Sequence, residues 1–262
     1  MQYTICTDLL SGRNAVLQCL LLTTILAASP AVSAFTASGG FSMGLEHTDN
    51  VRLDPVNEED DQILTTVLDG YIEEDDGPLT GEATASISNL NYLDDSFGEE
   101  NYFRLGSRLK WIQVKDRLVW HVSDYFDQRE IDSLGTSTPN NTESVNAFSI
   151  GAGLTLPVAD RHVIGITPSF QDFYYDSTDA DNQQFGLAAA WSYQLRPTIS
   201  VSLGGDVRDV QYDDQVANSD YQARRINAGI NVTRSRYDYS ITAGQTDIKR
   251  DMFNDTDGFN AK

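Results

Sequence analysis

The chain has 262 residues, of which 10% are aromatic, and a formal net charge of −21 at pH 7. Such acidity would repel nucleic-acid phosphates and so argues against a nucleic-acid partner. Both cysteines, Cys6 and Cys19, lie among the first 34 residues, and the rest of the chain is therefore expected to have no disulfide or thiol chemistry.

The first 34 residues have the pattern of a secretory signal peptide. Arg13 precedes an apolar run over 15–28, and small residues follow at 32–34. The run is shorter than the roughly 20 residues of a membrane-spanning helix. We expect export with cleavage after Ala34, which leaves a single β domain over 35–262. An exported chain without cysteine fits a bacterial envelope protein.

Beyond residue 35, apolar and polar residues alternate in one segment after another. From Phe185 to Leu195, apolar side chains fill every second position and Gln, Gly, Ala and Ser fill most of the others. The same alternation occurs at 41–47, 102–114, 118–122, 146–156, 199–203, 226–232 and 237–244. Period two is typical of β-strands, and no stretch shows convincing helical periodicity. The sequence therefore predicts an all-β protein.

Two kinds of connection alternate along the chain. Tight turns are predicted near 76–77, 115–116, 159–160, 196–197 and 235–236. Longer polar loops are predicted at 53–61, 93–101, 130–143, 176–182, 213–220 and from about 247 onward. Strands of about 12 to 15 residues would then run up and down, with short turns at one end and long loops at the other. An outer-membrane barrel has this arrangement.

Strand length and the polar positions both favour a membrane barrel over a soluble sandwich. Soluble strands usually have about 3 to 10 residues, whereas about 14 residues tilted near 40° cover roughly 35 Å and cross an apolar band about 25 Å tall. The wet face of a sandwich carries many Lys and Glu. Here it carries mostly Gly, Ser, Thr, Ala, Asn and Gln, which suit the inside of a barrel. We predict an up-and-down antiparallel transmembrane β-barrel with about 11 to 12 strands in this chain.

The end of the chain departs from the usual barrel pattern. Residues 260–262 are mostly polar, whereas a bacterial barrel normally has an even number of strands and ends on a strand with a terminal aromatic residue. We therefore expect a C-terminal truncation and an open or imperfectly closed barrel, in which the last strand does not pair with the strand near Phe41.

Aromatic residues gather near the predicted strand ends. Those near tight turns are Trp111, Trp120, Trp191, Tyr193, Tyr237 and Tyr239, and those near long loops include Tyr102, Tyr174 and Tyr212. Two aromatic girdles, one at each membrane interface, are typical of transmembrane barrels. Lipid of the outer membrane is accordingly a predicted partner.

Five basic residues are candidates for lining a lumen. They are Arg104, Arg108, Lys110, Arg208 and Arg225, all at polar positions of the alternation. In a water-filled lumen they would line a path for anionic sugars or other anions. The alternative is internal salt bridging to Glu82, Asp206 or Asp238. Placing such cations toward lipid would cost up to about 2 to 4 kcal/mol each near the midplane, so an inward orientation is expected in either case.

Acidic clusters and histidines are the remaining candidates for chemistry. The clusters fall at 58–61, 73–76, 94–100 and 213–214, and the ordinary interpretation is solvated loops. Weak Ca²⁺ or Mg²⁺ binding is the alternative, although none has the spacing of a calcium loop. No other metal site and no cofactor is expected. His47, His121 and His162 lie near different strand ends without a catalytic motif, so we assign no catalytic residue and predict no enzyme.

One segment resembles a known family. It is LEHTDNVRLDP at 45–55, followed by an acidic loop and DQI at 61–63. It resembles the β-barrel porin family found in exopolysaccharide and exosortase (PEP-CTERM) gene clusters, whose members begin with a YTDNV-type first strand. Here His47 replaces the usual aromatic residue. Members are usually longer, in line with the expected truncation. The resemblance implies a Gram-negative outer-membrane location and a role in surface polysaccharide biosynthesis or export, and it supplies no catalytic residues.

Three functions stay open on the sequence alone. The first is a passive channel or scaffold for surface polysaccharide, with the polymer or its export machinery as partner. The second is a general diffusion porin for small solutes. The third is a structural or adhesive barrel whose acidic outer loops bind a partner.

Overall fold

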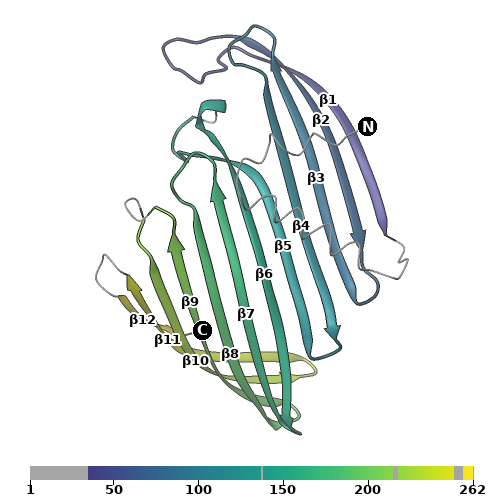
Figure 1. Cartoon of the computed structure of the whole chain (residues 1–262), viewed down its shortest axis with the longest axis vertical. Helices are drawn as coiled ribbons and strands as arrows, with labels where there is room; N and C mark the ends of the chain where they lie inside the picture. Colours follow the sequence, from purple (N-terminus) through teal and green to yellow (C-terminus); the bar gives the residue numbers. More distant parts are fainter. Residues whose placement is uncertain (1–34, 137, 215–217, 251–255, 262) are drawn as a thin grey trace. The chain divides into compact units, whose positions relative to one another are not determined.

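Twelve β-strands form one sheet in the computed structural model, which describes residues 35–136, 138–214, 218–250 and 256–261. The strands lie in sequence order from β1 to β12, and each is antiparallel to its neighbours (Figure 1). The predicted all-β, up-and-down architecture is therefore confirmed. The predicted signal peptide at 1–34 lies outside the described residues.

The strands are long, as their alternation predicts. Their bounds are β1 (Thr36–Thr48), β2 (Asp61–Glu74), β3 (Leu79–Tyr92), β4 (Glu100–Val114), β5 (Leu118–Glu130), β6 (Thr142–Ala159), β7 (His162–Tyr175), β8 (Asn182–Arg196), β9 (Ile199–Tyr212), β10 (Tyr221–Arg234), β11 (Tyr237–Arg250) and β12 (Thr256–Ala261). All except β12 have 13 to 18 residues. One short 3-10 turn, Pro139–Asn141, lies in the loop before β6. No helix within the described ranges is long and apolar enough to cross a membrane.

The five predicted tight turns are all present, and they join β2 to β3, β4 to β5, β6 to β7, β8 to β9 and β10 to β11. Two of them need left-handed backbone: Gly77 has φ 91° and Asp116 has φ 60°. Glycine has no Cβ to clash there, and Asp is one of the few other residues that tolerate this region. These two residue types help to explain why the chain reverses so sharply at these positions.

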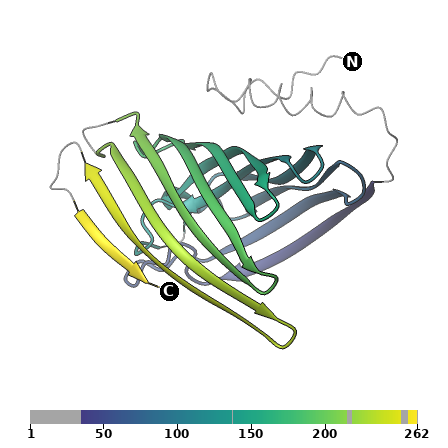
Figure 2. The ribbon, with the colours of Figure 1, turned by 90° about the horizontal axis from the view of Figure 1, so that it is seen from below.

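The sheet has two edges. β1 pairs with β2 over its whole length, and β12 pairs with the loop-side half of β11. Within the described strands, β1 and β12 do not pair with each other, as expected from the sequence. Figure 2 shows that the sheet between these edges is curved rather than flat.

The register sorts the side chains onto two faces. Residues paired directly across neighbouring strands share a face, so the pairs Ile164–Trp191 and Trp191–Leu203 continue one apolar surface from β7 to β9. We call the face that carries Trp191 the apolar face. The opposite face, which carries Arg104 and Gln184, is the polar face.

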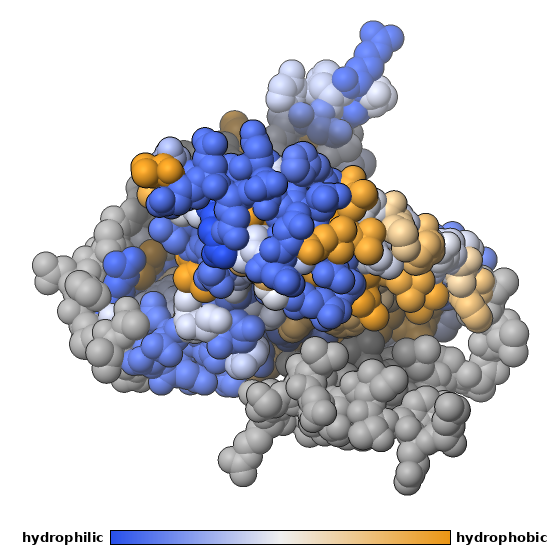
Figure 3. Space-filling model, turned by 90° about the horizontal axis from the view of Figure 1, so that it is seen from above, coloured by the Kyte–Doolittle hydropathy of each residue, from blue (hydrophilic) through white to orange (hydrophobic). Residues whose placement is uncertain are grey.

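The apolar face is largely uncovered. Phe41 is 65% exposed and Ile241 is 70% exposed. Only Tyr92, Ala152 and Val210 are buried apolar residues in the part of the chain that the structure describes. Figure 3, seen from the loop end, shows a cover of hydrophilic residues with hydrophobic residues exposed beside it. The sheet is thus a single layer whose apolar side chains have no second layer to pack against among the described residues.

Close packing across β3 and β4 gives a stability test on Gly81. A Cβ added there would clash with the backbone oxygen of Arg108, so Gly81→Ala is expected to lower the free energy of unfolding by about 1 to 3 kcal/mol. Gly70, on the same face of β2, has open space at its Cβ position, and Gly70→Ala should change stability by less than about 0.5 kcal/mol. Guanidinium unfolding followed by circular dichroism measures both, and equal losses would contradict the packing explanation.

Candidate functional site

All five candidate lumen residues lie on the polar face. Arg104 and Arg108 pair with Ser86 and Glu82 of β3, and Lys110 pairs with His121 of β5. Further along the sheet, Arg208 on β9 pairs with Gly186 of β8, and Arg225 on β10 pairs with Asp206 of β9. Because pairing preserves the face, these basic side chains share one face of the sheet, in one group on β4 and a second on β9 and β10.

Three of the five make ion pairs between adjacent strands: Arg104, Arg108 and Arg225, the last with Asp206. Arg104 Nε lies 2.7 Å from Asp127 Oδ1. Arg108 Nη1 lies 3.5 Å from Glu82 Oε1, and its Nε donates to the Tyr125 hydroxyl. Two of the three acids expected as partners, Glu82 and Asp206, are therefore used.

The pair on β9 and β10 has the most regular geometry. Arg225 Nε donates to Asp206 Oδ1 at 2.8 Å and its Nη2 donates to Oδ2 at 3.2 Å. Such forked contacts fix both the distance and the orientation of the guanidinium. The third expected acid, Asp238, makes no ion pair within the described residues.

Lys110 and Arg208 differ from the other three. Both are exposed on the polar face, and neither makes an ion pair with a side chain that the structure describes. Their charges are therefore the uncompensated cations among the five candidates. A dissolved anion close to this face would meet them without displacing a protein carboxylate.

The turn-side aromatic residues share the apolar face. Trp111 and Trp120 are direct partners across β4 and β5. On β7 and β8, His162 pairs with Tyr193, and Trp191 Nε1 donates to His162 Nδ1 at 3.1 Å. Tyr237 and Tyr239 begin β11 on the same face and Tyr174 lies on it near the loop end of β7.

Tyr102 and Tyr212 depart from the prediction because both lie on the polar face. Tyr102 pairs with Ser88 and precedes Arg104 by two positions, and Tyr212 pairs with Asn182. Nearness to a loop indicates how high a residue sits in the sheet, but the alternation decides its face. Phenylalanines fill the loop side of the apolar face instead: the ring centroids of Phe170 and Phe185 are 5.0 Å apart.

Charged residues mark the loop-side limit of the apolar face. Four of them stand fourth from the loop end of their strand: Asp172, Asp209, Arg224 and Asp247. From there to the tight turn each strand has about ten residues, which cover roughly 25 Å at a tilt near 40°. That height matches the apolar band of a transmembrane barrel.

Asp124 is an acidic residue on the apolar face that sequence reasoning missed. It stands at the centre of β5, is 6% exposed, and accepts a hydrogen bond from Asn146 Nδ2 at 2.8 Å. Ser107, directly across on β4, is also buried. The neighbours thus satisfy and cover this carboxyl group within an otherwise apolar surface.

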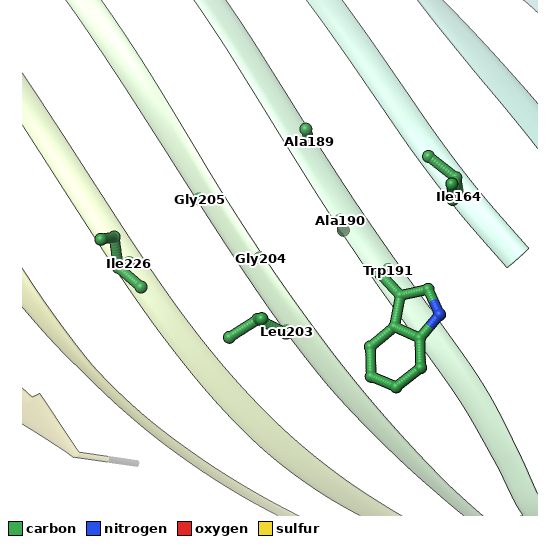
Figure 4. A pocket seen from close by; sticks show the side chains of 8 residues that line it. All are labelled: Ile164, Ala189, Ala190, Trp191, Leu203, Gly204, Gly205 and Ile226. Atoms are coloured by element: carbon green, nitrogen blue, oxygen red, sulfur yellow. The ribbon is translucent and has the colours of Figure 1, made fainter. Parts of the chain in front are cut away.

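The apolar face also has a shallow hollow over β7 to β10 (Figure 4). Trp191, Leu203 and Ile226 border it, and Ala189 and Gly205 offer little or no side chain in between. Its lining is aliphatic and aromatic, which suits a flexible hydrocarbon chain.

Buried carboxylates fasten the long loops to the strand ends. Asp61, the first residue of β2, is fully buried and accepts hydrogen bonds from the backbone N–H groups of Gln62 (2.6 Å), Asp94 (2.9 Å) and Ser96 (3.1 Å). The Ser96 hydroxyl donates to it as well. Burial by itself raises the pKa of Asp61, but these hydrogen bonds outweigh it, so the pKa lies below its usual value. Loop 93–99 is thereby tied to β2.

Glu143, the second residue of β6, has the same role further along the sheet. It is 1% exposed and lies 2.9 Å from Arg129 Nη2. The Thr178 backbone N–H (3.1 Å) and hydroxyl (2.9 Å) both donate to its carboxylate. Arg129 in turn lies 4.2 Å from the ring centre of Tyr175. Loop 176–181 is therefore anchored to β6.

Other acidic residues also act as acceptors for backbone N–H groups. Asp54 accepts from Val56 and Asn57, and these bonds hold its pKa below the usual value. Arg52 pairs with Glu59 and donates to the backbone oxygen of Ser96, which joins the first two long loops. Among the described side chains, no group of three or more His, Cys, Asp or Glu is placed to hold a metal ion.

Comparison with known proteins gives only distant likenesses. No protein-family model and no curated protein matches the chain. A loop L8 deletion mutant of OmpT, an outer membrane protein of Vibrio cholerae, is 9% identical, with 87% of this chain and 98% of that chain covered and a TM-score of 0.42. An outer membrane channel from Pseudomonas putida F1 is 12% identical (88% and 94% covered, TM-score 0.41). An anion-selective porin from Comamonas acidovorans is 10% identical (83% and 89%, TM-score 0.37). At these scores none of the likenesses indicates what this chain does.

The Asp61 contacts predict an acid-sensitive loop. Asp61→Asn is expected to speed backbone hydrogen exchange at 94–96 by about ten-fold, because the amide has one acceptor oxygen where the carboxylate has two. In the unmodified protein, a carboxyl with a lowered pKa stabilises the loop above the unfolded value of about 3.9, and that contribution is lost as the pH falls through its folded pKa. Hydrogen exchange by mass spectrometry at several pH values measures both effects.

Asp60 provides the matched control, because it is exposed and adjacent to Asp61. Asp60→Asn should leave exchange at 94–96 and its acid dependence unchanged. Equal effects of the two substitutions would contradict a specific role for Asp61.

Proposed function

We propose that residues 35–262 form a bacterial outer-membrane β-barrel with a hydrated interior. The exposed apolar face is the observation that carries the proposal. Apolar surface is driven out of water, and soluble monomers rarely expose large contiguous patches of it. Lipid supplies an apolar environment for side chains such as Phe41 and Ile241 without a second protein layer.

The strands and edges support the same proposal. Strands of 13 to 15 residues, which most of the long strands are, span the apolar band with a few residues left over at the loop end. In lipid, an unpaired row of backbone N–H and C=O groups costs several kcal/mol per group, so only closed sheets cross a membrane. The proposal therefore includes pairing of both open edges, β1 and β12, with backbone partners that the described strands do not supply.

The polar face would become the wall of the lumen. Its central strands carry small residues such as Ser149, Gly151 and Ser169, which leave room for water. Its arginines are largely compensated by neighbouring carboxylates, while Lys110 and Arg208 are not. A passive channel in which these two cations favour anionic solutes follows from that distribution.

The finer role that we propose is passage or assembly of surface polysaccharide. Its support is the resemblance at 45–55, which forms the end of β1 and the first long loop. Asn50 Nδ2 donates to the Asp54 backbone oxygen at 2.8 Å, and the Asp54 N–H returns a bond to Asn50 Oδ1 at 3.0 Å. The residues that carry the resemblance are thus the ones that shape this loop.

Channel activity is tested by reconstitution. The purified protein is expected to migrate faster on a gel before heating than after it and to produce stepwise conductance in planar bilayers. Lys110→Gln with Arg208→Gln should lower the anion-to-cation permeability ratio by about two-fold, because two uncompensated cations are lost. The reversal potential in a salt gradient measures this ratio.

The Arg108–Glu82 pair offers the control. Arg108→Gln together with Glu82→Gln removes one charge of each sign and should leave the reversal potential unchanged. Absence of both heat-dependent migration and conductance would contradict the barrel itself. Conductance with the same reversal potential in all variants would contradict only the role of Lys110 and Arg208.

The polysaccharide role is tested in the native host. Deletion of the gene should reduce cell-surface polysaccharide and leave polymer in the periplasm, because its route across the outer membrane is lost. Sugar analysis of surface and periplasmic extracts measures both pools. Normal surface polysaccharide with slower uptake of small solutes would indicate a general diffusion porin instead.

A further inference from the structure

The two ends of the sheet differ in charge. The four tight turns from β4–β5 onward carry six exposed basic side chains and two acidic residues, Asp116 and Asp160, whereas the β2–β3 turn is acidic. The basic residues are Lys115, Arg117, Arg161, Arg196, Arg234 and Arg236. The long loops at the other end are dominated by Asp and Glu, as at 58–60, 94–95 and 213–214. An anionic surface would therefore meet attraction at the turn end and repulsion at the loop end.

The basic residues at the turns have no carboxylate partners among the described side chains. The ion pairs that the structure shows use Arg52, Arg104, Arg108, Arg129 and Arg225, none of which lies in one of the five tight turns. Arg234 lies over the Tyr237 ring at 5.9 Å, a contact that leaves its N–H groups free for an acceptor. The turn-end cations are thus available to an external anion.

Aromatic residues with polar edges stand next to these cations on the apolar face. Trp191 is 37% exposed, Tyr237 is 43% exposed and Tyr239 is 62% exposed. His162 stacks on Tyr193 with ring centroids 4.5 Å apart. Trp and Tyr prefer the level of lipid headgroups, where the ring meets hydrocarbon and the N–H or O–H meets water. The cations therefore sit at the height at which headgroup phosphates lie.

We propose that the tight-turn end is a docking surface for anionic phospholipid headgroups, with Arg161, Arg196 and Arg236 as principal contacts. This inference rests on the proposed membrane location. The guanidinium fork matches two phosphate oxygens, and long Arg and Lys stems reach along the interface while keeping the charge in the headgroup layer. The turn end thereby faces the leaflet rich in anionic phospholipid, and the acidic loops face away from it.

The tryptophans provide a built-in probe. All three in the chain, Trp111, Trp120 and Trp191, lie near the tight-turn ends of their strands. The full chain is reconstituted into two kinds of vesicle. One mixes brominated phosphatidylglycerol with unbrominated phosphatidylcholine, and the other mixes unbrominated phosphatidylglycerol with brominated phosphatidylcholine. Tryptophan quenching in the two then gives the relative binding constant of the two lipids. We expect a preference of about five-fold for phosphatidylglycerol. This ratio of binding constants should fall toward one in about 0.5 M sodium chloride, because salt screens the attraction between the cations and the headgroups.

A matched pair of triple variants tests the named contacts. Arg161→Gln/Arg196→Gln/Arg236→Gln should abolish most of the preference. The control variant, Arg224→Gln/Lys249→Gln/Arg250→Gln, removes the same charge from exposed positions near the loop ends of β10 and β11. It should keep the preference for phosphatidylglycerol. Heat-dependent gel migration confirms that both variants fold.

Each outcome decides between the claims. Equal quenching by the two brominated lipids in the unmodified protein would overturn the docking surface and leave the membrane barrel in place. Equal loss in both triple variants would also overturn it, since it would show a general effect of charge. No quenching by either lipid would overturn the proposed membrane location, and the docking surface with it.

Discussion

A sheet with one apolar face and no second layer is the constraint on which the rest of this structure depends. In water such a face would be covered by another sheet or by helices, and the described residues contain neither. Among the residues whose burial the structure describes, only three apolar residues are buried. The long strands, the small polar residues on the opposite face and the alternation of short turns with long loops all accord with a sheet that has lipid on one side and water on the other.

That arrangement changes what the charges do. On the polar face, three of the five candidate lumen residues each form an ion pair with a carboxylate on a neighbouring strand. The other two, Lys110 and Arg208, are exposed to water. At the loop end, the buried carboxylates of Asp61 and Glu143 accept backbone N–H groups and so replace the hydrophobic contacts that usually hold a loop down. The acidity that looks in the sequence like a property of solvated loops is therefore partly structural.

The turn end has a different balance. Its arginines and Lys115 make no ion pair with the side chains that the structure describes, and they lie toward the same end of the sheet as the tryptophans, which is the basis of the proposed headgroup surface. Asp124 is an exception to this division of the sheet, because a carboxyl group lies at the centre of β5 on the apolar face. It is tolerated there because Asn146 satisfies it and its neighbours cover it.

The sequence by itself determined the strands up to β11, the tight turns, the two faces and the shared side of the five basic residues, because side-chain alternation is local and has a period of two. It was wrong about the end of the chain, where β12 forms in a stretch predicted to be a loop from about 247 onward. Only the tertiary structure decided which charges meet. Arg104 pairs with Asp127 and Asp61 with Ser96 because the register brings distant residues together, and register depends on pairing along whole strands. The faces of Tyr102 and Tyr212, in contrast, follow from the local alternation, because each tyrosine lies an even number of positions from an arginine of the polar face, Arg104 or Arg208.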